Sequence, residues 1–107
     1  MARARYIAVG LAVLVLTGAA PLRAAETKIV TIENLQFQPV TLTVKQGDTV
    51  VWRNADLFPH NVVAQGGAFR SPEIAANGRW TYTAKQKGEF GYACTLHPSM
   101  KGTLIVH

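Results

Sequence analysis

The sequence has a single cysteine, Cys94, among its 107 residues. A lone cysteine excludes an internal disulfide and any metal centre that needs two thiolates from one chain. An exposed free thiol is a liability in an oxidising compartment, so in an exported protein Cys94 would be buried and inert or held by a ligand. The cysteine count alone leaves these two interpretations open.

The sequence also lacks a run of basic residues. The whole chain carries 11 Lys and Arg against 6 Asp and Glu, but Arg3, Arg5 and Arg23 lie in the N-terminal segment. Residues 26–107 therefore keep 8 basic and 6 acidic side chains, a net charge of +2. Because no basic cluster remains, nucleic-acid binding has little support.

No apolar run is long enough to cross a bilayer, which takes about 20 residues. The N-terminal run at 7–16 follows Arg3 and Arg5 and is followed by several small residues. A basic start, a short apolar run and small residues are typical of a secretory signal peptide.

We expect the segment 1–25 to be this signal peptide, cleaved after Ala24 or Ala25. Arg23 departs from the small-residue pattern of a cleavage site, and an uncleaved N-terminal anchor is the alternative. Cleavage would leave 26–107 as one small domain in the periplasm, with no span through the membrane.

Residues 26–107 lack the 3.6-residue apolar period of an amphipathic helix. They show short alternating runs rich in β-branched and aromatic residues, with turn signals about every 8 to 12 residues. A short helical turn is expected at 73–76. We expect strands at 28–32, 35–38, 40–45, 49–54, 60–65, 79–84, 89–94 and 102–106. The predicted fold is all-β, a small antiparallel Greek-key sandwich or barrel of seven or eight strands.

Soft metal ligands gather near the C-terminal end of the chain. Cys94, His97 and Met100 follow one another at three-residue intervals. A thiolate, an imidazole and a thioether together suit copper better than a hard cation. This stretch supplies at most three ligands, so a fourth has to come from elsewhere.

His60 is the candidate for the fourth ligand. The remaining histidine, His107, is the last residue and is expected on a frayed end. In a Greek-key sandwich, a strand from the middle of the chain commonly lies beside the penultimate strand. The loop before His60 and the loop after Cys94 would then meet at one pole. Two histidines, one cysteine and a weak axial methionine are the ligand set of blue-copper electron-transfer sites.

Each of these residues taken alone has an ordinary explanation. A cysteine is commonly buried, a single histidine needs no metal, and a methionine commonly fills a core. The combination is far more specific: Cys-x-x-His-Pro-x-Met precedes a terminal strand, and Pro-His-Asn stands upstream at 59–61. It favours a copper site made of His60, Cys94, His97 and Met100.

With these motifs the chain resembles the cupredoxins, and among them the amicyanin type of the plastocyanin-like group. Two residues between Cys94 and His97, and two between His97 and Met100, give the short ligand loop of that type. The resemblance extends over about 28–107. It rests on Asn-Leu-Gln-Phe-Gln-Pro at 34–39, Gly-Asp-Thr-Val-Val-Trp at 47–52, Pro-His-Asn at 59–61, and 94–100.

The resemblance implies one type 1 copper ion and a role for Asn61 as well as for the four ligands. Asn61 is expected to hydrogen-bond across the two ligand loops and to stabilise the thiolate. Leu96 stands where the amicyanin type usually has proline, so its N–H is free to point at the Cys94 sulfur and raise the reduction potential. Ser99 stands where an aromatic residue is typical, which weakens the apolar rim expected around His97.

The sequence therefore predicts a periplasmic carrier of single electrons that alternates between Cu(I) and Cu(II). The alternative is a copper storage or delivery protein. Delivery sites tend to be rich in methionine or histidine, whereas Met100 is the only methionine after the initiator. An enzyme is not expected, because 26–107 is too short for a multicopper oxidase and four ligands leave no open position.

The resemblance also implies an amine dehydrogenase as electron donor and a cytochrome c as acceptor. Redox encounters of this kind are brief and use small interfaces. We expect a monomer with an apolar docking surface on the two ligand loops. This surface is predicted to consist of Leu57, Phe58, Pro59, Leu96, His97 and Pro98.

Overall fold

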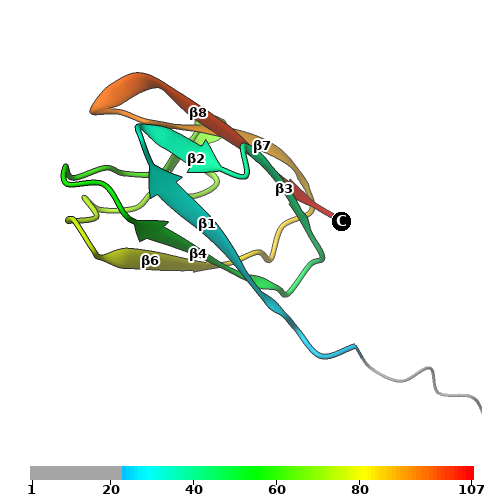
Figure 1. Ribbon diagram of the computed structural model, residues 1–107. Helices are drawn as coiled ribbons and strands as arrows, with labels where there is room; N and C mark the ends of the chain where they lie inside the picture. Colours follow the sequence, from blue (N-terminus) through cyan, green and yellow to red (C-terminus); the bar gives the residue numbers. More distant parts are fainter. Residues whose placement is uncertain (1–22) are drawn as a thin grey trace, which may run out of the picture.

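The structure is a computed structural model that describes residues 23–107, so most of the expected signal peptide lies outside the described residues. Eight strands form two four-stranded sheets that pack face to face (Figure 1). The strands are β1 (Thr27–Glu33), β2 (Gln36–Gln38), β3 (Thr41–Val44), β4 (Thr49–Asn54), β5 (Val63–Ala64), β6 (Arg79–Thr83), β7 (Gly88–Cys94) and β8 (His97–Val106). The expected all-β, two-layer fold is confirmed. Within 23–107, no helix has the length and apolar character needed to span a membrane.

Each sheet mixes parallel and antiparallel neighbours. One sheet has the order β2-β1-β4-β6, and the other has the order β3-β8-β7-β5. β1 and β4 are parallel, as are β3 and β8, whereas the remaining neighbours are antiparallel. The expected antiparallel pairing therefore holds for most neighbours, and these two parallel pairs depart from it. The chain leaves the first sheet after β2 and returns after β3, and this detour lays β4 beside β1 in the same direction.

The core between the sheets is aromatic at its centre. Alternation along β4 places Val50 and Trp52 on the inner face, as expected, and both are fully buried. The Trp52 ring meets the Tyr92 ring of β7 edge to face, with centroids 5.6 Å apart. The Phe37 ring of β2 also meets the Tyr92 ring, with centroids 4.8 Å apart. Tyr92 stands two residues before Cys94 on the same inward face, so the aromatic core supports the strand that carries the cysteine.

Two expected elements differ from the structure near His60. The strand expected at 60–65 is reduced to β5, because the backbone of His60 pairs with Ile74 across an isolated bridge. The helical turn expected at 73–76 is wrong, since Ile74 takes part in that bridge. A 3₁₀ turn, η1 (Gln65–Gly67), follows β5 instead.

Leu35 is not the inward neighbour of Phe37 that strand alternation predicts. Asn34 and Leu35 have φ angles of 55° and 57° and form the turn between β1 and β2. This left-handed backbone leaves the Leu35 side chain exposed while Phe37 remains buried. It also directs both turn N–H groups at one carboxylate, which belongs to the site described below.

The expected ligand loops and the C-terminus lie at opposite ends of the molecule. The turn between β7 and β8 and the loop after β4 lie at one end, and the segment before β1 lies at the other with the C-terminus (Figure 1). His107 is not frayed as expected, because its N–H donates to the Val44 carbonyl at 3.0 Å and its carbonyl accepts from Gln46 at 2.8 Å. His107 is therefore fixed at the end away from the expected ligands.

Gly102 of β8 is a position where a side chain would disturb the core. It pairs with Tyr92, and a Cβ at Gly102 would overlap the Tyr92 ring. We predict that Gly102→Ala lowers the free energy of unfolding by about 1–3 kcal/mol, because the ring has to move in a closely packed interior. Gly91→Ala is the control, since a Cβ there meets only the Gln65 side chain at 3.5 Å. Urea unfolding measures both variants, and equal stabilities would contradict the prediction.

Candidate metal centre

A tight hairpin carries two of the expected ligands. Cys94 ends β7 and pairs with His97, the first residue of β8, across the turn formed by Thr95 and Leu96. β8 thus begins five residues before the expected strand at 102–106. Since a two-residue turn leaves little slack, the cysteine and the histidine have to lie close to each other.

An irregularity in the same hairpin positions Met100. The register shifts after Ala93, which pairs with Lys101, so the three residues 98–100 have no partner on β7. Extra residues on one strand bend it and redirect their side chains. Met100 is turned inward as a result and is only 2% exposed, whereas Ser99 is exposed.

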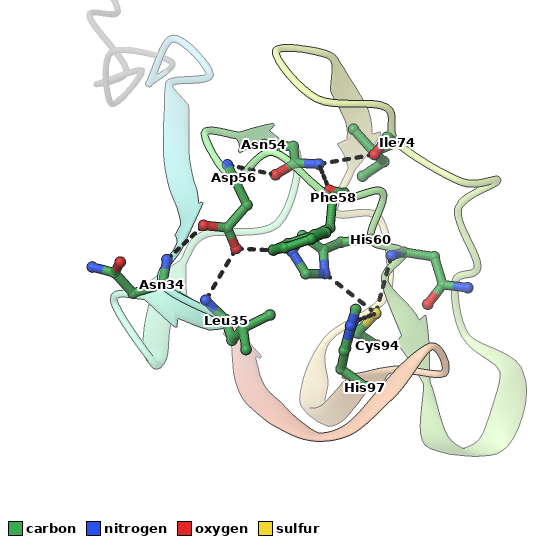
Figure 2. A network of polar contacts seen from close by, with 10 residues as sticks. Asn34, Leu35, Asn54, Asp56, Phe58, His60, Ile74, Cys94 and His97 are labelled. Atoms are coloured by element: carbon green, nitrogen blue, oxygen red, sulfur yellow. Dashed lines mark hydrogen bonds and ion pairs between the residues drawn. The ribbon is translucent and has the colours of Figure 1, made fainter.

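His60 lies in the segment that crosses from β4 in one sheet to β5 in the other. Its N–H donates to the Ile74 carbonyl at 3.1 Å, and its carbonyl accepts from the Ile74 N–H at 2.7 Å. The side-chain amide of Asn54, at the end of β4, donates to the carbonyls of Phe58 and Ile74 at 2.7 and 3.0 Å (Figure 2). These bonds fix the loop on both sides of the imidazole, which is completely buried.

The structure brings His60, Cys94 and His97 together. Nδ1 of His60 lies 3.7 Å from Cys94 Sγ, and Nδ1 of His97 lies 3.9 Å from the same sulfur. All three ligand atoms lie within 4.8 Å of one another, and the two imidazole centroids are 5.0 Å apart. Nitrogen and sulfur bound at about 2.0 and 2.3 Å to one ion in a trigonal plane would be about 3.7 Å apart. The donors therefore have the spacing that one small ion requires.

The chemistry of the donors selects the kind of ion. Two imidazoles and a thiolate suit a borderline or soft transition metal and offer nothing to calcium or magnesium. His60 and Cys94 are fully buried, and His97 is the partly exposed member of the group. Of these three donors, His97 is thus the one that solvent reaches.

Asn61 links the two ligand loops, the role expected from the resemblance. Its side-chain amide donates to Thr95 Oγ1 at 2.8 Å and accepts from the Thr95 N–H at 2.7 Å. Its own N–H points at Cys94 Sγ at 3.4 Å. Of the hydrogen bonds formed within 23–107, none joins the Leu96 N–H to that sulfur, and the backbone donor that points at it is that of Asn61.

Asp56 belongs to the site although the sequence did not indicate it. Its Oδ2 lies 2.8 Å from Nε2 of His60, the ring nitrogen that faces away from Cys94. The same carboxylate accepts the N–H groups of Asn34 at 2.7 Å and Leu35 at 3.0 Å (Figure 2). An acidic residue four positions before an expected histidine ligand was the available clue, but spacing within a loop does not tell where a side chain points.

The environment of Asp56 keeps it ionised. Burial alone would raise the pKa of Asp56, but the bonds from Leu35, His60 and Asn34 outweigh burial and hold this pKa below its ordinary value. An ionised Asp56 accepts a hydrogen bond from the protonated Nε2 of His60. The lone pair of His60 Nδ1 is then free, as a metal ligand requires. The carboxylate thereby sets both the tautomer and the orientation of the His60 ring.

The predicted docking surface lies open around the two loops. Leu57, Phe58 and Leu96 are 86%, 56% and 44% exposed, so Phe58 does not pack inside. Pro59 and Pro98 are also exposed, and His97 is half-buried. A partly covered ligand thus lies among exposed apolar side chains.

Asp56→Asn tests whether the carboxylate supports metal binding. The amide keeps the size of the side chain but removes its charge, so we predict a loss of copper affinity of about 10–100-fold. Glu89→Gln on β7 is the control, because it makes the same change in charge at an exposed side chain. Competition titration with a chelator measures both variants, with circular dichroism to verify folding. Equal affinities in the two variants would contradict the role given to Asp56.

Comparison with known proteins places this site in a family. A family model described as "Cupredoxin-like domain" matches residues 6–106. Amicyanin from Paracoccus versutus is 34% identical over 87 residues, which cover 77% of this chain and 66% of that protein. Amicyanin from Paracoccus denitrificans is 34% identical over 95 residues, covering 80% of this chain and 72% of that protein. A solved structure of an amicyanin variant with Cu(I) matches with a TM-score of 0.71 at 30% identity, covering 76% of this chain and 82% of that one. The chain therefore belongs to the cupredoxin-like family, the one-copper proteins that its motifs resemble.

Proposed function

We propose that this protein carries single electrons through one copper ion held by His60, Cys94, His97 and Met100. The observation that supports this most strongly is the triangle of two Nδ1 atoms and one Sγ, with spacings of 3.7 and 3.9 Å about the sulfur. A copper ion in this set supplies a one-electron couple between Cu(I) and Cu(II). The residues around the triangle support the fast exchange of the electron, the choice of copper and the route of the electron.

Fixed ligands favour rapid exchange of an electron. Asp56 holds the His60 ring, and Asn61 holds both the Cys94 sulfur and the turn that follows it. Ligands restrained in this way have little freedom to rearrange when the charge on the metal changes. The smaller the rearrangement, the lower the barrier to electron transfer.

Met100 is proposed as the weak fourth ligand. It is buried three residues after His97, in the segment that bulges away from β7. A thioether is a soft donor that suits copper and adds little to a site for zinc. Met100 therefore favours a redox-active copper site over a structural zinc site.

The electron is proposed to enter and leave past His97. His97 is the partly exposed ligand, and Leu57, Phe58 and Leu96 form exposed apolar surface on the two ligand loops. An apolar surface without a dense cluster of charge suits short-lived docking of a redox protein. By analogy with relatives named amicyanin, the proposed donor is an amine dehydrogenase and the acceptor a cytochrome c.

A carrier accounts for the site better than copper delivery or catalysis does. A delivery protein has to release its ion, whereas here two of the three clustered donors are fully buried and fixed by hydrogen bonds. An enzyme needs an open position for substrate, and four ligands would leave none. We further propose that the segment 1–25 exports the protein to the periplasm and that 26–107 acts there as a monomer.

Repeated redox cycling separates a carrier from a delivery protein. The copper-loaded protein is reduced and reoxidised several times in the presence of a chelator for Cu(I), and its copper content is measured after each cycle. A carrier retains one copper ion throughout while its Cu(II) signal disappears and returns. Loss of the ion on the first reduction would favour delivery and would overturn the proposal.

Leu96→Lys tests the route past His97 without requiring a known partner. Electrons exchange between oxidised and reduced copies of the protein only when two copies meet, so we predict that a charge on this surface slows self-exchange about tenfold or more. Ile29→Lys is the control, because Ile29 is 51% exposed on β1 and lies outside the ligand loops. Nuclear magnetic resonance line broadening in mixtures of the two oxidation states gives the rates. Equal slowing in both variants would exclude Leu96 from the route.

A further inference from the structure

A buried carboxylate lies at the end of the domain away from the ligands. Asp48, in the turn between β3 and β4, is completely buried while residues 23–25 are present, and it lines a surface hollow together with Arg23 and Glu26. Its Oδ1 accepts the N–H of Glu26 at 2.9 Å, and its Oδ2 accepts the N–H of Lys45 at 2.9 Å. The guanidinium of Arg23 contacts both oxygens, at 2.9 Å to Oδ1 and 3.0 Å to Oδ2. The bonds from Arg23, Glu26 and Lys45 hold the pKa of Asp48 far below its usual range, so Asp48 is an anion.

The expected cleavage would remove the only cationic side chain bonded to this carboxylate within 23–107. Arg23 lies on the leader side of both proposed cleavage points, after Ala24 and after Ala25. Removing the counter-charge from a carboxylate with little access to water is destabilising. Cleavage at either point also creates a new positive charge, the α-ammonium group of the new first residue.

We propose that this new α-ammonium group replaces Arg23 as the ionic partner of Asp48, so that processing of the leader completes the fold. Cleavage after Ala25 converts the Glu26 nitrogen, already 2.9 Å from Asp48 Oδ1, from an amide into an ammonium group. Cleavage after Ala24 places the charge one residue upstream. The inference rests on the export proposed above and extends it to the processed terminus.

The surroundings of Glu26 suit this exchange. Its carbonyl accepts the N–H of Thr49 at 2.9 Å, so β4 holds the residue in place. Glu26 is exposed, and the additional protons of an ammonium group can therefore face water. The conversion turns a hydrogen bond between a neutral N–H and a carboxylate into an ion pair, in which donor and acceptor both carry charge.

Other charged groups around this end supply no replacement for Arg23. Lys28 Nζ lies 3.1 Å from the Glu26 carboxylate, and Lys45 contacts Asp48 through its backbone. The His107 side chain lines the same surface hollow as Glu26 and Asp48, but none of the hydrogen bonds within 23–107 joins it to that carboxylate. The α-ammonium group that cleavage creates is therefore the cation best placed to pair with Asp48.

The test compares two copper-loaded chains that differ only in where they begin. One begins at Glu26, and the other begins at Ala24 and so carries its terminal charge two residues upstream without Arg23. We expect the chain that begins at Glu26 to melt about 4 °C higher or more. The same pair is made with Asp48→Asn, in which the difference should vanish because the carboxylate no longer carries charge.

The pH dependence distinguishes an ion pair from a hydrogen bond whose donor is uncharged. Pairing with Asp48 raises the pKa of the α-ammonium group above its unpaired value of about 7.7–8.0. The extra stability is therefore complete below that value and disappears as the pH rises through the raised pKa. Titration of the terminal amine by nuclear magnetic resonance reports the same shift and remains usable if Asp48→Asn lowers the yield of folded protein.

Two results would overturn the inference. One is a chain beginning at Glu26 that has the same stability as the extended chain, or whose terminal amine titrates at its ordinary pKa. The other is a terminus of the exported protein, found by mass spectrometry, that retains Arg23. Copper binding and redox cycling are measured on the same samples, so failure here is distinct from failure of the proposed electron carrier.

Discussion

The site depends on hydrogen bonds that join two segments far apart in the sequence. Asn61 and Thr95 exchange two bonds, at 2.8 and 2.7 Å, across 34 positions of sequence. These bonds connect the crossing that carries His60 to the hairpin that carries Cys94. On the opposite side of the imidazole, Asp56 ties His60 to the turn between β1 and β2. The donor triangle is therefore fixed by three segments, and the two-sheet fold is the means by which they meet.

This arrangement explains why the site suits electron transfer better than binding or release of a substrate. Asp56 restrains His60 and Asn61 restrains Cys94, and the partly exposed His97 is the donor that faces outward. Restraint lowers the cost of changing the charge on a metal, and burial keeps other molecules away from it. An electron can pass through a histidine ring edge, whereas a ligand would need an open position.

Sequence patterns predicted the parts of the site that depend on residue type and local spacing. Cys94, His97 and Met100 were recognisable because soft donors at three-residue intervals are rare by chance, and alternation predicted the inward face of β4. The role of Asp56 was missed, because its contact with His60 depends on the path of a loop rather than on a period. Leu35 and Ile74 depart from the sequence prediction for a similar reason. A left-handed turn and an isolated bridge are set by contacts with distant segments, which alternation cannot encode.

If Cys94 and two histidines hold one copper ion in a site that changes oxidation state, the visible spectrum of the purified protein loaded with Cu(II) reveals it. An intense blue colour from the thiolate bound to copper is expected, which bleaches on reduction and returns on oxidation. The colour should be absent in Cys94→Ser under the same loading conditions. A colourless Cu(II) complex of the unaltered chain, or a colour that survives removal of the cysteine, would contradict the account.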